Sequence, residues 1–143
     1  MTSPVYDLGT KSITTPLTSS IITAGVSAAG VAQNFLDGFG GIAGLTIEAN
    51  FTAGTGGTSV IAVVRTALGD DNWIEIARFD FATTSVMKVC NLSGLDTVAV
   101  STVALLGANA VLNGILGDRF QAYLTTTGTY ASNAAIAIRI APR

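Results

Sequence analysis

The sequence contains no histidine, and this absence removes the commonest catalytic designs. Histidine is the side chain most often used as a general base near neutral pH, and it is the commonest protein ligand of metals. Ser–His and Cys–His pairs therefore cannot form, and a zinc site built from one cysteine and scattered carboxylates would be exceptional. We predict that the chain is not an enzyme and that it uses no cofactor and no metal.

Cysteine is almost absent as well, since Cys90 is the only one, and no disulfide can form within the chain. Its neighbours are typical of a strand, so we interpret Cys90 as a buried and unreactive thiol. A chain of 143 residues fits one domain and can bury a core without a disulfide or a metal.

Charge is also scarce: charged residues make up 11% of the chain, against about 25% in an ordinary domain. A surface of Thr, Ser, Ala, Asn and Gly with so little charge tends to associate. We expect copies of the chain or another protein to cover much of it, and a neutral soluble monomer is the alternative. The seven cations form no cluster, so we expect no nucleic-acid partner.

One long apolar stretch, residues 98–117, has the length of a membrane-spanning helix. It is interrupted by serine, threonine, two asparagines and three glycines, and no basic residues flank it. We interpret it as buried strand and loop and expect no membrane partner. The first residues show neither the basic nor the apolar region of a signal peptide.

Alternating apolar and polar residues predict several half-buried strands, in which one face joins the core. The clearest lie within residues 45–51, 59–68, 73–81, 84–94, 118–128 and 133–142. Turn signals recur every 8–12 residues, which indicates an all-β, antiparallel two-sheet sandwich of jelly-roll type with about eight strands.

Two local details refine this prediction. Residues 59–68 and 73–81 are expected to form a hairpin, and the last two strands are expected to form another around residues 127–133. The apolar positions change parity within 73–81, which predicts a β-bulge near Ala77 and Arg78.

The first 18 residues are rich in Thr, Ser and Pro, and we predict an extended N-terminal arm there. The arm is either an edge strand or a tail that docks on a neighbour. Residues 19–143 are predicted to form a single β-sandwich domain, with one or two strands within 19–36.

Binding motifs are few. Residues 54–57 are glycine-rich, but no lysine or helix follows, so we interpret them as a turn and not a phosphate loop. Asp70, Asp71, Asn72 and Glu75 resemble a calcium site only loosely, and we interpret them as part of a solvated hairpin turn. Trp73, the only tryptophan, is compatible with a residue at the edge of the core, an interface anchor or a sugar-stacking platform.

Two segments, one around Trp73 and one near the C-terminus, form a combined pattern. A strand leads through an acidic turn to Trp73, and residues 114–131 later carry Gly117-Asp118-Arg119-Phe120 and Thr127-Gly128-Thr129. Over residues 45–141 this pattern resembles small structural proteins of tailed-phage virions, namely the β-sandwich proteins that decorate or cement heads.

The resemblance implies a non-enzymatic structural protein of the virus particle. Such proteins commonly form trimers that bind the major capsid protein at capsomer junctions, which implies a homotrimer on the capsid surface of the virion, made in the host cytoplasm. Their N-terminal arms often reach a neighbouring subunit, so we expect deletion of residues 1–16 to weaken attachment more than folding.

Six candidate interface residues follow from these arguments: Pro4, Tyr6, Trp73, Arg78, Arg119 and Tyr123. The alternative function is a carbohydrate-binding or adhesin module of a phage tail or baseplate. That module would use Trp73, and Tyr123 or Tyr130, to contact the sugar.

Overall fold

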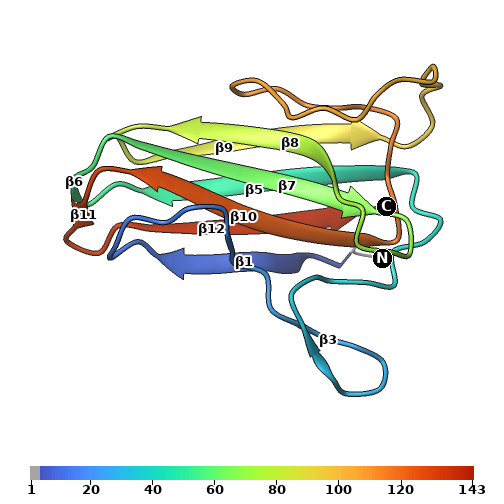
Figure 1. Cartoon of the computed structure of the whole chain (residues 1–143), viewed down its shortest axis with the longest axis horizontal. Coiled ribbons are helices and arrows are strands. Elements are labelled where there is room, and N and C mark those ends of the chain that lie inside the picture. Colours follow the sequence, from blue (N-terminus) through green and yellow to red (C-terminus); the bar gives the residue numbers. More distant parts are fainter. Residues whose placement is uncertain (1–3) are drawn as a thin grey trace.

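The structure, a computed structural model, describes residues 4–143, which form strands, turns and loops (Figure 1). The strands are β1 (Tyr6–Ser12), β2 (Ser20–Ile21), β3 (Gly25–Val26), β4 (Ala32–Gln33), β5 (Gly44–Thr52), β6 (Thr55–Gly56), β7 (Ser59–Ala67), β8 (Ile74–Phe81), β9 (Val86–Ser93), β10 (Arg119–Thr127), β11 (Tyr130–Ala131) and β12 (Ala135–Pro142). None of the described residues belongs to a helix that could span a membrane.

Two four-stranded antiparallel sheets form the sandwich. Sheet A has the strand order β1-β12-β5-β9, and sheet B has the order β2-β10-β7-β8. Counted along the chain, these strands lie in the order 1-8-3-6 in one sheet and 2-7-4-5 in the other. This is the eight-stranded jelly roll. The predicted all-β sandwich is confirmed, although four further short strands raise the number above about eight.

The core lies between the two sheets and is filled by the alternate residues that the sequence pattern indicated. In β5, for example, Leu45, Ile47, Ala49 and Phe51 are buried. The inward residues of β10 face them from sheet B, and those of β12 lie beside them in sheet A, namely Phe120, Ala122, Leu124, Ile136, Ile138 and Ile140. Period-2 alternation therefore placed the core correctly, because successive side chains of a strand point to opposite faces.

Strand pairing agrees with one predicted hairpin and contradicts the other. β7 and β8 pair as expected, with a register shift that leaves Ile76 as the extra residue on β8. This bulge lies one residue before the predicted position. The predicted hairpin of the last two strands is wrong, because β10 belongs to sheet B while β12 pairs with β1 and β5 in sheet A.

The N-terminal segment is part of the sandwich. β1 pairs along its whole length with β12, and Leu8 and Ile13 are buried in the core. Of the two alternatives for residues 1–18, the structure has the edge strand over Tyr6–Ser12. Residues 1–3 lie outside the described part of the chain.

Two long excursions leave the sandwich on opposite sides (Figure 1). Residues 22–43 carry the small β3–β4 hairpin, and residues 94–118 connect β9 with β10. Of the predicted buried strand and loop within 98–117, the loop is confirmed and the buried strand is wrong, since the segment contains no strand and most of it is exposed. Its apolar residues have no unfilled layer to enter, because the inward faces of both sheets already fill the core.

The glycine-rich segment 54–57 forms a tight turn where β6 pairs with β11, at the end of the sandwich opposite the two chain termini (Figure 1). Gly54, Gly56 and Gly57 all have positive φ. A side chain on Gly57 would collide with the ring of Tyr130, which packs directly on it. The turn interpretation of this segment is confirmed by its backbone geometry.

Candidate interaction surface

A polar and aromatic cluster lies on the outer face of sheet B. The register of β10, β7 and β8 places Gln121, Arg65 and Glu75 in one cross-strand row. The neighbouring row along the strands on the same face contains Tyr123 on β10, Val63 on β7 and Arg78 on β8. Residues that are distant in sequence thus become lateral neighbours, since directly opposite side chains lie about 4.5–5.5 Å apart.

Arg65 is the centre of this cluster. Its Nε donates a hydrogen bond to Gln121 Oε1 at 2.6 Å. Its guanidinium group lies 4.8 Å from the centre of the Tyr123 ring and 5.5 Å from that of Trp73. Such contacts contribute about 0.5–2 kcal/mol each, depending on how well water is excluded. Burial lowers the pKa of Arg65 from its ordinary value.

Tyr123 links the cluster to β8, because its hydroxyl donates to Glu75 Oε2 at 2.5 Å. Burial, followed by the hydrogen bond to Glu75, raises the pKa of Tyr123 to about 12. The phenol therefore stays protonated near neutral pH and remains a donor. Glu75 is 7% exposed, so this bond satisfies an oxygen that water reaches poorly.

Residues 33–36 cover part of this outer face. Gln121 Nε2 donates to the carbonyl of Asn34 at 2.9 Å, which explains why an outward-facing glutamine is only 1% exposed. The ring of Phe35 packs against Trp73, with ring centres 5.8 Å apart, and the guanidinium group of Arg119 lies 4.5 Å from the Phe35 ring. Phe35 therefore connects Arg119 with Trp73.

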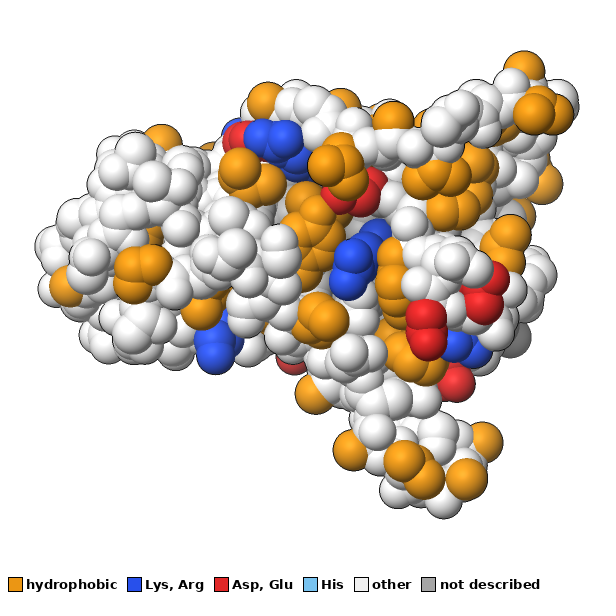
Figure 2. Space-filling view, in the orientation of Figure 1, with side chains coloured by type: hydrophobic (Ala, Val, Ile, Leu, Met, Phe, Trp, Pro, Cys, Tyr) orange, Lys and Arg blue, Asp and Glu red, His pale blue; other side chains and the backbone are white. Residues whose placement is uncertain are grey.

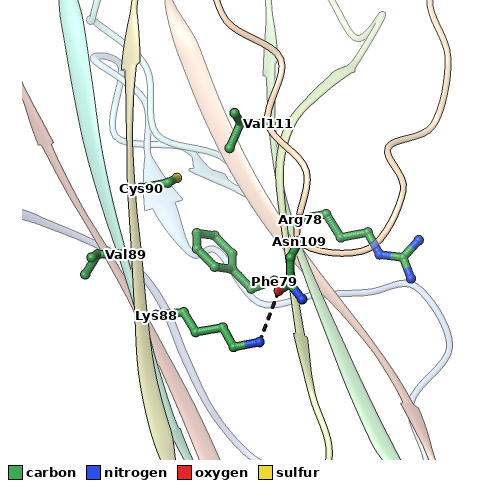
Figure 3. A pocket seen from close by; sticks show the side chains of 7 residues that line it. All are labelled: Arg78, Phe79, Lys88, Val89, Cys90, Asn109 and Val111. Carbon is green, nitrogen blue, oxygen red and sulfur yellow. Dashed lines mark hydrogen bonds between the residues drawn. The ribbon is translucent and has the colours of Figure 1, made fainter.

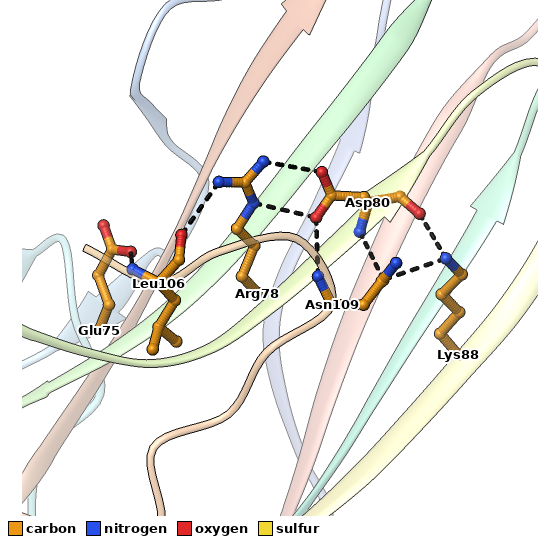
Figure 4. A network of polar contacts seen from close by, with 6 residues as sticks. All are labelled: Glu75, Arg78, Asp80, Lys88, Leu106 and Asn109. Carbon is orange, nitrogen blue, oxygen red and sulfur yellow. Dashed lines mark hydrogen bonds and ion pairs between the residues drawn. The ribbon is translucent and has the colours of Figure 1, made fainter.

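A hydrogen-bond network fixes the second excursion to the edge of β8 (Figure 4). Arg78 pairs with the Asp80 carboxylate at 2.8 Å and donates to the Leu106 carbonyl at 3.0 Å, while the Leu106 amide donates to Glu75 at 3.0 Å. Asp80 and Asn109 exchange two reciprocal hydrogen bonds of 3.1 Å. The Arg78 hydrogen bond is the main reason that the pKa of Asp80 lies below its usual value.

The other end of the excursion is fixed at its base. The side chain of Asn113 accepts from the amide of Ser93 at 2.6 Å and donates to the carboxylate of Asp96. The amide of Gly94 donates to the carbonyl of Ala43 at 2.7 Å. Both ends are therefore anchored, and no residue from 97 to 105 forms a hydrogen bond with another described residue.

Residues 97–105, named here the apolar loop, are exposed throughout. Val100 is fully exposed and Leu105 is 82% exposed, and no charged residue occurs between positions 97 and 117. The β3–β4 hairpin has the same character, with Val26 66% exposed and no charge from position 12 to 36. Figure 2 shows charged side chains on the central face and only apolar and uncharged polar groups on the two protrusions.

A hollow of about 410 Å³ lies beside Trp73, between the β7–β8 turn and the apolar loop. It is lined by Leu68, Asp70, Asp71, Asn72, Trp73, Ile74 and Val103. Asp70 accepts hydrogen bonds from the amide and the side chain of Asn72, at 3.1 and 2.8 Å. These bonds lower the pKa of Asp70, as expected for a carboxylate that caps its own turn. The described residues contain no group of three or more metal-ligating side chains.

The structure brings four of the six predicted interface residues to this surface. Trp73 and Tyr123 both contact Arg65, and Arg119 joins them through Phe35. Arg78 lies on the same face, across Val63 from Tyr123. Pro4 and Tyr6 lie elsewhere, at the start of β1, where Tyr6 packs on Phe39 with ring centres 4.9 Å apart. Trp73 is half-buried between Arg65 and Phe35 on the outer face of sheet B, and it does not belong to the core between the sheets.

Glu75, Gln121 and the apolar loop were not predicted as parts of a site. Gln121 faces outward as its parity indicated, but its burial depends on residues 33–36, which are far away in the sequence. A carboxylate between two isoleucines was a signal for Glu75, because a buried charge needs partners. The absence of charge from 97 to 117 was the available signal for the loop.

No protein-family model matches the chain, and neither a curated protein nor a solved structure matches it.

Proposed function

We propose that the chain is a non-enzymatic structural subunit of a virus particle, attached as an oligomer to the capsid at capsomer junctions. The apolar loop is the observation that carries this proposal. Val98, Val100, Val103 and Leu105 form an uncharged exposed patch on a segment whose two ends are anchored. Exposed apolar patches of this kind mark surfaces that another protein covers.

The cluster on sheet B suits the centre of such a contact. Arginine and aromatic side chains dominate the energetics of protein interfaces, and Arg65, Trp73 and Tyr123 already hold each other in place. Side chains that are ordered before binding lose less conformational entropy when the partner arrives. A capsid also presents many equivalent sites, so an oligomer gains avidity from contacts that are individually weak.

The fold is compatible with this role. Jelly rolls recur in viral capsid domains, although one fold can host unrelated functions. The resemblance of residues 45–141 to phage decoration proteins adds to the argument. The combination of apolar loop, sparse charge and jelly roll therefore favours a particle subunit.

The test uses purified particles of the virus that encodes the chain. Immunogold labelling should place the chain on the capsid surface, and the purified chain should sediment with capsid shells that lack it. Val100→Asp with Val103→Asp should weaken binding to shells at least tenfold, because two carboxylates would have to be desolvated at the contact. Thr83→Asp with Thr84→Asp is the matched control, since both residues are exposed in the turn between β8 and β9, outside this surface.

Unchanged binding of the double variant would contradict the assignment of the surface. A monomer in light scattering that also fails to bind shells would contradict the function itself.

A carbohydrate-binding role has one specific observation in its favour, namely the hollow where Trp73 lies beside two carboxylates and an amide. Aromatic faces and polar oxygens together are suited to sugars, and lectins also use the jelly roll. A glycan array separates the two functions. Binding that is lost in Trp73→Ala while capsid attachment is absent would favour the sugar-binding role.

A further inference from the structure

Strand β9 has an open edge, whereas the other three edges of the sandwich are closed or blunted. β1 carries a register shift at Leu8, and β2 is only two residues long. β8 is covered by the second excursion through two backbone hydrogen bonds of 2.9 Å. The amide of Arg78 donates to the carbonyl of Ala110, and the amide of Leu112 donates to the carbonyl of Ile76. Such devices prevent unwanted strand pairing, so the uncovered edge needs its own explanation.

The hydrogen-bond pattern identifies which backbone groups of β9 face outward. Both backbone groups of Ser93 form hydrogen bonds on the side away from β5. Its amide donates to Asn113 Oδ1 at 2.6 Å, and its carbonyl accepts from the amide of Gly114 at 2.8 Å. In an antiparallel pair, inward-bonded and outward-facing residues alternate, and no register shift interrupts the β5–β9 pairing. Met87, Val89 and Asn91 therefore also direct an amide and a carbonyl outward.

These backbone groups have no partner among residues 4–143, because the only hydrogen bonds to that edge are those at Ser93. The side chains of Met87 and Val89 are exposed as well, at 54% and 62%. An exposed strand with unpaired donors and acceptors is a template for a further strand.

Beside this edge, the two sheets leave a hollow of about 290 Å³ between β8 and β9 (Figure 3). Figure 3 shows Lys88 and Cys90 on the side of β9 that faces Phe79, and Val89 on the opposite side. Phe79, Cys90 and Val111 give the hollow an apolar lining. Burial raises the pKa of Cys90 to about 11, so its thiol stays neutral and serves as part of that wall.

A strand added to β9 would run about 4.8 Å from it, and every second side chain would point into this hollow. The rim of the hollow carries the ammonium group of Lys88, which donates to the carbonyl of Asp80 at 2.5 Å and to Asn109 Oδ1 at 3.1 Å. No carboxylate of residues 4–143 lies within ion-pair distance of Lys88, since Asp80 pairs with Arg78. The site therefore favours an incoming acid.

We propose that the β9 edge, with the hollow behind it, accepts an extended segment of another protein that has alternating apolar residues and a carboxylate opposite Lys88. A second copy of this chain is the poorer occupant. Pairing two β9 strands around Met87–Asn91 would bring two Lys88 ammonium groups to the same face of the joined sheet, where like charges repel. The proposal does not depend on the proposed function.

The probe is the synthetic peptide Thr-Ile-Thr-Ile-Thr-Asp-Thr, in which the isoleucines and the aspartate share one face. In NMR hydrogen exchange, millimolar peptide should slow exchange of the Met87, Val89 and Asn91 amides at least fivefold. A peptide with lysine in place of aspartate should bind at least threefold more weakly. Lys88→Glu should reverse this preference for the charge of the peptide.

Val89→Pro tests the edge directly, because it removes an outward amide while leaving the pairing with β5 intact. It should abolish binding and leave the melting temperature almost unchanged. Absence of protection by the aspartate peptide, or equal binding of both peptides, would overturn the proposal. Protection without any peptide, together with dimers in sedimentation, would assign the edge to a second copy and would also overturn it.

Discussion

Strand β7 and the apolar loop have similar residues but opposite surroundings. Residues 59–67 read SVIAVVRTA and residues 97–105 read TVAVSTVAL. Every residue of β7 pairs with β10, and Val60, Ala62 and Val64 are completely buried. Every residue of the apolar loop is exposed. Apolar composition therefore does not decide burial; what decides it is whether the rest of the chain supplies neighbours.

The physical reason lies in the two environments. β7 is flanked by β10 and β8, and its inward side chains meet the core residues of sheet A. The apolar loop is held at both ends on the rim of the sandwich, where no strand or layer remains to cover it. The hydrophobic effect then favours covering this loop with a surface from outside the chain.

The test with the largest expected effect replaces a valine by aspartate in each of the two regions. Val64→Asp should prevent cooperative folding, because an unpaired buried charge costs several kcal/mol out of a typical total stability of about 5–15 kcal/mol. Val100→Asp should change the free energy of unfolding by less than about 0.5 kcal/mol. Thermal denaturation followed by circular dichroism measures both. Similar effects of the two substitutions would remove the contrast.

A second test extends the comparison to the N-terminal segment. Leu8→Ala should lower the free energy of unfolding by about 2–5 kcal/mol, since Leu8 is fully buried. Val5→Ala, at an exposed position three residues earlier, is the control and should have little effect. Urea denaturation gives both values, and a small effect of Leu8→Ala would mean that β1 is a dispensable arm.

The same packing changes the expectation for a deletion of residues 1–16. Such a deletion removes Leu8 and Ile13 from the core and exposes the edge of β12. We now expect it to reduce stability at least as much as it reduces attachment.

The smallest expected effect concerns the anchor of the apolar loop. The pKa of Asp80 is lowered by Arg78, so the stability from this pair is present above the unfolded-state pKa of about 3.9 and is lost as the pH falls through the folded-state pKa. Asp80→Asn should lower stability at pH 7 by about 0.5–1 kcal/mol, because the pair is partly exposed. Its stability should also decline less steeply than the wild type below pH 5. Parallel pH profiles of the melting temperature would contradict this.

Local sequence patterns predicted the parts of the fold that depend on neighbouring residues. Alternation identified the inward residues of β5, β10 and β12, and the parity change located the β8 bulge to within one residue. The predicted hairpin between β10 and β12 failed, because a short turn is compatible both with pairing in one sheet and with crossing to the other. Only the competition of all strands for partners separates these outcomes.

The candidate surface was predictable in part. Trp73, Arg78 and Tyr123 were identified from residue type and strand position, and Arg119 from its place beside an acid. The burial of Gln121 depends on Asn34, and the place of Glu75 depends on Leu106. No local pattern encodes those contacts, because they join segments that meet only after the sandwich has formed.

The sequence alone determined that this chain forms strands with one buried face, that it has no histidine-based chemistry and that it has little charge to keep its surface in water. Those properties follow from residue type and from period-2 geometry, which act over a few residues. The tertiary structure decided which apolar segments are covered, which strand edge stays open and which polar residues meet. Burial and edge pairing depend on the neighbours that each segment finds, and those neighbours come from distant parts of the chain.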